Sequence, residues 1–126
     1  MSDSLNLYDT LFPVIRKAQP HEDARRLGIF VWALVGLLVE KTISLPAIAL
    51  AIVSTAKTDS RIRRLRRFLA NPHVCVRAYY DALIRGALAE WAGQTLYLIL
   101  DTTTVAGRLV ILRVSVVYRG RAIPLA

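Results

Sequence analysis

The residues best placed to do chemistry in this sequence are cations. Six of the seventeen Lys and Arg residues fall within eleven consecutive positions. On a helix that turns about 100° per residue, three of them, Arg63, Arg64 and Arg67, lie opposite an apolar face formed by Ile62, Leu65 and Leu69, with Phe68 at its edge. Arg61 and Arg66 flank the boundary between the two faces. Forked arginine donors suit phosphate oxygens, and contacts with DNA release counterions; a solvated helix face is the alternative interpretation. The cluster comprises Lys57, Arg61, Arg63, Arg64, Arg66 and Arg67.

Asp101 is the second candidate, because it is the only acidic residue after Glu90. It closes the apolar run of residues 95–100, which is typical of a central strand covered on both faces. A carboxylate at this point is costly unless it caps a turn with residues 102–104, pairs with a cation or binds a metal. Mg²⁺ usually takes one or two carboxylates together with substrate phosphates, so Asp101 alone supplies half a site at best.

Other chemistries find little support in the sequence. Cys75 is the only cysteine, and His21 and His73 are the only histidines, so neither a disulfide framework nor a Cys/His metal pattern is present. Cys75 and His73 flank Val74 beside Pro72, and they are interpreted as a packed thiol near an exposed imidazole rather than a catalytic pair. This cysteine usage is typical of a reduced, cytoplasmic protein.

A helix-turn-helix-like pair is predicted to position the basic cluster. Ser44 and Pro46 are typical of a helix start, as a cap and as a residue of the first turn. Residues 54–60 are polar and turn-like, and Asn71-Pro72 ends the basic helix. The predicted helices cover residues 22–40, 44–53, 61–70 and 72–91.

The sequence changes from helical to strand periodicity near Thr95. The segments that follow are rich in Val, Ile and Leu and predict strands. Uncovered strands of this kind expose a large apolar surface, which would support self-association. The predicted strands are residues 95–101, 109–118 and 122–126, separated by turns at Gly107 and residues 119–121.

The predicted fold class is α+β, with helices preceding strands. Residues 1–21 contain Pro13 and Pro20 and are expected to form a loosely structured leader. Residues 22–93 are expected to form a helical DNA-binding-like module. Residues 94–126 are expected to begin a sheet domain.

The charge balance points to a polyanionic partner. A formal charge of +8 and a pI near 10.4 favour nucleic acid or an anionic membrane surface. The apolar run of residues 27–39 has only 13 residues, whereas a membrane span takes about 20. Asp3 and Asp9 do not fit the basic start of a signal peptide. Charge alone does not choose between these two partners. Because the basic helix follows a short helix and a polar turn, the expected partner is double-stranded DNA, and no membrane segment is expected.

Three blocks carry a resemblance to a known family. They are RIRRLRRFLAN at residues 61–71, LILDTTT at residues 98–104 and YRGRAIPL at residues 118–125. In order and spacing they resemble the amino-terminal third of bacterial insertion-sequence transposases of the DDE class, and the resemblance covers about residues 25–126. It implies an RNase H-like domain in which Asp101 is the first of three catalytic acids that hold Mg²⁺ for strand cleavage and transfer.

The same resemblance implies a second Asp and a Glu that the sequence does not contain at matching positions. With one of three metal ligands present, we expect a truncated transposase of a mobile element that keeps DNA binding at most, needs no cofactor itself and is not an enzyme alone. A free-standing helix-turn-helix protein and, less favoured, a small membrane protein are the alternatives. Three apolar strands argue against a simple helix-turn-helix regulator.

Overall fold

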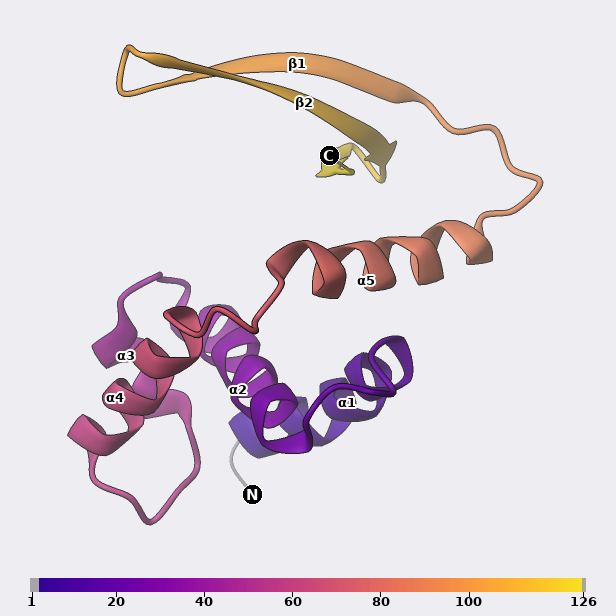
Figure 1. Ribbon diagram of the computed structural model, residues 1–126. Coiled ribbons are helices and arrows are strands. Elements are labelled where there is room, and N and C mark those ends of the chain that lie inside the picture. The colour runs from indigo at the N-terminus through magenta and orange to yellow at the C-terminus, as the bar shows by residue number, and fades with distance from the viewer. Residues whose placement is uncertain (1–2, 126) are drawn as a thin grey trace. The chain divides into compact units, whose positions relative to one another are not determined.

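The computed structural model describes residues 3–125, which form five helices followed by three strands (Figure 1). The predicted α+β class is confirmed. The helices are α1 (Asp3–Ala18), α2 (Ala24–Glu40), α3 (Leu45–Ala51), α4 (Thr58–Leu69) and α5 (Val76–Glu90). The strands are β1 (Leu98–Val105), β2 (Leu109–Tyr118) and β3 (Arg121–Pro124).

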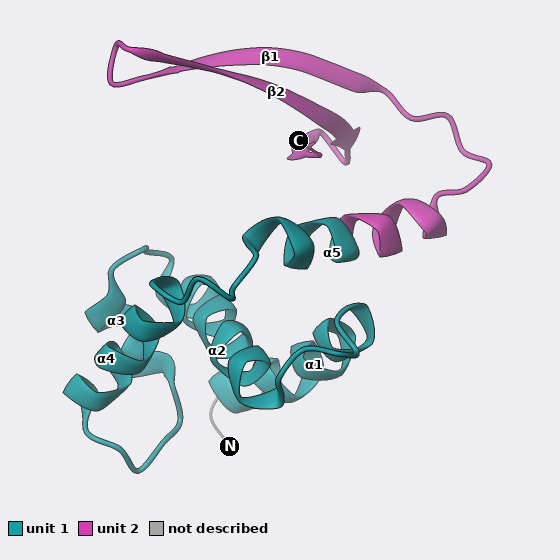
Figure 2. Ribbon diagram, viewed as in Figure 1, with its two compact units in different colours: residues 1–83 teal, residues 84–126 magenta. Residues whose placement is uncertain are grey.

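The chain divides into two compact units, residues 1–83 and 84–126, and α5 contributes to both (Figure 2). The division falls inside α5, before the boundary expected at residue 93. The second half of this helix packs with the strands, since the ring of Trp91 stacks on Tyr118 with centroids 4.8 Å apart. Packing of a helix end therefore decides the boundary more than the change in periodicity does.

Helix α1 replaces the loosely structured leader that was expected over residues 1–21. Pro13 lies inside this helix, where a missing N–H and a steric clash cost about 3 kcal/mol. Packing offsets that cost: Ile15 is buried, and the ring of Tyr8 stacks on Trp32 of α2 with centroids 4.4 Å apart. The expectation was wrong because the amphipathic face of α1 outweighs the local preference of proline.

Helices α2, α3 and α4 pack around a shared core in the first unit. Leu65 of α4 contacts Ile48 and Ile52 there, and all three are buried. Helices α2 and α3 approach closely at Gly36, where an added Cβ would lie 2.5 Å from Ile48 Cγ2 and 3.0 Å from its carbonyl oxygen. The predicted short helix, polar turn and basic helix are confirmed, although α4 begins at Thr58 and not at residue 61.

None of the helices described between residues 3 and 125 is both long and apolar enough to cross a membrane alone. Helices α2 and α3 meet the length and composition criteria only as a pair, and the chain bends by 100° between them. Several residues of α2 lie in the protein core, among them Leu27, Val31 and Val35.

The three strands form an antiparallel meander in the order β1-β2-β3. Both predicted turns are confirmed: Ala106 and Gly107 have positive φ in the first, and Arg119 and Gly120 in the second. The first loop has three residues, 106–108, and the second has two, 119–120. Consecutive positive φ values match the twist of a hairpin, and the glycine of each pair adopts its value at no steric cost.

The sheet is largely uncovered, contrary to the expectation that its first strand is buried on both faces. Every residue of β1 is exposed. The register places Leu98, Leu100, Val110 and Leu112 on one face, and they are 61–69% exposed. The apolar run of β1 therefore forms an exposed surface and not a buried central strand.

Candidate nucleic-acid interface

Helix α4 exposes most of the predicted DNA-binding cations to solvent. Because its opposite side packs in the core, the helix holds these side chains on a fixed backbone. Its flanks carry no counter-charge beyond the first turn, since no acidic residue occurs between Asp59 and Asp81. The exposed cations, which we call the basic face, are Lys57, Arg63, Arg64, Arg66 and Arg67.

The apolar side of α4 differs by one residue from the prediction. Leu65 and Phe68 are buried, and Ile62 packs against the core. Leu69, expected on this side, is 65% exposed. The helix ends at Leu69. Phe68, which precedes it, points inward, and the centroid of its ring lies 6.2 Å from that of Phe30 in α2.

Arg61 was predicted to contact DNA, but the structure gives it a different role. Its guanidinium donates hydrogen bonds to four carbonyl oxygens at the end of α3 and in the following turn, at 2.9–3.3 Å. The last carbonyls of a helix lack partners within the helix, and Arg61 satisfies them while joining α4 to α3. It is therefore removed from the basic face. The acceptors belong to Ala49, Ile52, Ser54 and Ala56.

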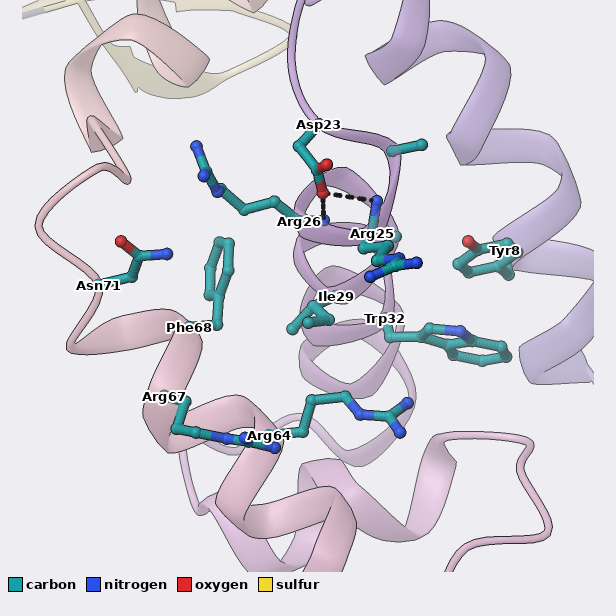
Figure 3. Close-up of a pocket in the computed structure, with 12 residues that line it drawn as sticks. Tyr8, Asp23, Arg25, Arg26, Ile29, Trp32, Arg64, Arg67, Phe68 and Asn71 are labelled. Atoms are coloured by element: carbon teal, nitrogen blue, oxygen red, sulfur yellow. Dashed lines mark hydrogen bonds between the residues drawn. The ribbon is translucent and has the colours of Figure 1, made fainter.

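Two arginines of α2, which the sequence did not single out, lie beside the basic face. Arg25 and Arg26 lie in the first turn of α2 and line the same open cavity as Arg64 and Arg67 of α4 (Figure 3). The cavity has a volume of about 860 Å³, and we call it the α2–α4 groove. Their position could have indicated a binding role, because two adjacent cations at the start of a helix interact unfavourably with the helix dipole and do not stabilise the helix.

The charges at the start of α2 are partly compensated. Asp23 accepts the backbone N–H groups of Arg25 and Arg26, each at 3.0 Å, and these hydrogen bonds hold its pKa below the usual value. The Arg26 guanidinium donates to Glu22 at 3.0 Å. Glu22 also accepts a hydrogen bond from the hydroxyl group of the buried Tyr79 at 2.8 Å.

Apolar and aromatic side chains form the floor of the α2–α4 groove. Trp32 and Ile29 come from α2 and Phe68 from α4, while Tyr8 contributes from α1. Figure 3 shows Arg64 and Arg67 extending from α4 toward α2. Burial, and then the nearby Asp9 charge, raise the pKa of Tyr8, so its hydroxyl stays protonated at neutral pH.

Asp101 lies in the middle of β1 and not at its end, which corrects the sequence prediction. It stands opposite Arg113 of β2 in the antiparallel register. The carboxylate lies 3.6 Å from the Arg113 guanidinium and accepts the N–H of Thr102 at 2.8 Å. Arg113 is thus the cationic partner of Asp101. Both side chains are about half exposed, so this ion pair contributes little to stability.

The described residues do not fit the magnesium site that the transposase resemblance implies. No group of three or more His, Cys, Asp or Glu side chains that could hold a metal ion occurs within residues 3–125. The nearest charged group to Asp101 is a guanidinium, which competes with a metal for the carboxylate. We therefore assign no catalytic step to Asp101.

In comparisons with known proteins, no family model, no curated protein and no solved structure matches this chain. The function is therefore inferred from the chemistry of the described side chains. Their most pronounced feature is the basic face of α4 together with the neighbouring groove.

Proposed function

We propose that this protein binds duplex DNA through the basic face of α4. The observation that carries the proposal is the placement of four exposed arginines within five positions of one helix that is anchored by Leu65 and Phe68. Each guanidinium can donate to phosphate oxygens, and no acidic residue after Asp59 in α4 opposes the positive field. The four are Arg63, Arg64, Arg66 and Arg67.

The arrangement of α3 and α4 supports DNA over other polyanions. A short helix, a turn of a few residues and a basic helix form the outline of a helix-turn-helix unit, whose second helix contacts DNA. We expect weak binding with little sequence preference, because the exposed side chains of α4 are directed at phosphates and carry little base information.

We further propose that the chain belongs to the DNA-contacting part of a DDE-type transposase. The support is the resemblance of three sequence blocks, together with an antiparallel meander whose first strand carries Asp101. Strand transfer by this chain alone is not proposed, because no group of three or more His, Cys, Asp or Glu side chains that could hold a metal ion occurs within residues 3–125.

Replacing three arginines of the basic face should weaken DNA binding. The variant Arg63→Ala/Arg64→Ala/Arg67→Ala should lose on the order of tenfold to a hundredfold in affinity, if each exposed ion pair contributes up to about 1 kcal/mol. The slope of log affinity against log salt should also fall by about 0.9 per lost phosphate contact. Fluorescence anisotropy with a labelled duplex over a salt titration measures both.

A charge-matched variant provides the control. Arg85→Ala/Arg108→Ala/Arg121→Ala also removes three positive charges, all from exposed positions in the second unit. It should bind nearly as the parent does. Equal losses in the two variants would mean that total charge drives binding, and parental affinity in the α4 variant would show that the basic face is not the DNA site.

A further inference from the structure

Two adjoining basic surfaces meet at one residue of α4. Arg67 lines the α2–α4 groove, and it also lines a second cavity together with Ser60, Arg63 and Arg66. A polyanion that lies on the basic face can therefore extend into the groove. This continuity is the first observation that points to a shared ligand.

The groove gathers more positive charge than the protein neutralises. Four arginines line it against a single lining carboxylate, Asp23, which is engaged by two backbone N–H groups. Of the four, Arg26 has an acidic partner in Glu22. Converging cations repel each other, and Arg25 and Arg26 also oppose the dipole of α2. An arrangement that costs free energy when empty is relieved by an anionic ligand.

The aromatic floor strengthens any ion pair formed above it. Apolar walls lower the local dielectric, so attraction between an arginine and a phosphate held in the groove is greater than at an open surface. The partly buried Trp32 and the buried Phe68 form this floor. Arginines on both walls can donate to the two free oxygens of one phosphodiester.

We propose that the α2–α4 groove is a phosphate-binding site that takes the sugar-phosphate backbone of one DNA strand. It acts as a second contact beside the basic face and rests on the function proposed above. Arg25 and Arg64 are its most informative residues, because neither is engaged in an ion pair within residues 3–125 and both line the groove.

The test uses Arg25→Gln, which lies on α2 and outside the basic face. In the intact protein we expect affinity for a short duplex to fall roughly threefold to tenfold, with a salt slope lower by about 0.9. The matched variant Arg85→Gln removes one exposed charge far along the sequence and should bind as the parent does. Arg25→Lys keeps the charge without the fork and should lie between.

A second readout does not involve DNA. At low ionic strength Arg25→Gln should raise the melting temperature of the free protein, because relief of the repulsion with the adjacent Arg26 and of an unfavourable dipole interaction outweighs the lost attraction to the exposed Asp23. The gain should vanish at high salt, where these charges are screened. Arg85→Gln should show no such gain.

Comparing a duplex with the corresponding single strand shows which form of DNA supplies the phosphate. Losses on both would assign the groove to the backbone of either form, and a loss confined to the single strand would assign it to unpaired DNA. If Arg25→Gln bound both as tightly as the parent while Arg63→Gln/Arg66→Gln weakened binding, the groove inference would be wrong and the DNA-binding role would stand. If neither variant changed affinity, both would be wrong.

Discussion

Replacing Arg61 with Ala should lower the free energy of unfolding of the helical unit by about 1–3 kcal/mol, the cost of leaving partly buried carbonyls without a donor. The substitution removes all of the guanidinium hydrogen bonds to the end of α3 and its following turn. Arg61→Lys should recover only part of the loss, because an ammonium cannot reach carbonyls spread over this turn as a fork does. Urea unfolding followed by far-UV circular dichroism measures the change.

Arg63→Ala is the matched control for Arg61→Ala. Arg63 is exposed on the same helix, and surface changes of this kind stay within about 0.5 kcal/mol. The DNA-binding effects should run in the opposite order: under conditions where both variants are folded, Arg63→Ala weakens binding more. Equal stabilities for the two variants would show that the hydrogen bonds of Arg61 do not support α3.

The variant Gly36→Ala should destabilise the same unit by about 1–2 kcal/mol. A methyl group at this position would meet both the side chain and the backbone of Ile48. The backbone of α3 cannot rotate away as a side chain can, so overpacking of roughly 1–3 kcal/mol outweighs the helix propensity gained by replacing glycine.

Gly86→Ala should change the free energy of unfolding in the opposite direction from Gly36→Ala, although both glycines lie inside helices. Gly86 also lies inside a helix, but no atom lies within 4 Å of a Cβ added there. Its replacement should therefore stabilise α5 by about 0.5–1 kcal/mol through backbone entropy alone. A stabilising effect of Gly36→Ala, measured in the same way, would show that α2 and α3 are not in close contact at this position.

Local patterns predicted most of the secondary structure but not the roles of individual charges. The helical spacing and turn residues of the sequence located α2 to α5 and the strands within a few residues. They could not show that Arg61 turns toward α3, because its partners are backbone carbonyls, which every residue carries. The groove was missed for a related reason: Arg25 and Arg64 are far apart in the sequence and line one cavity only because α2 packs on α4.

Two other differences follow from tertiary context. Pro13 was given its usual meaning as a helix breaker, whereas contacts of α1 with α2 compensate for it. Asp101 was placed at a strand end because the apolar run stops there, but threonines also favour strands, and β1 continues through them to Val105. In both cases strand pairing or packing with a distant segment outweighed the structure that the local sequence favours.

The carboxylate of Glu22 has a consequence for how the groove would meet its ligand. Glu22 is held by the hydroxyl of the buried Tyr79, and in turn it holds the guanidinium of Arg26. An arginine immobilised before binding loses little rotamer entropy when it contacts a phosphate, whereas a free side chain loses about 0.5–1.5 kcal/mol. Arg26 is thus pre-organised by the core of the protein, and the position of the first turn of α5 sets the geometry of one wall of the groove.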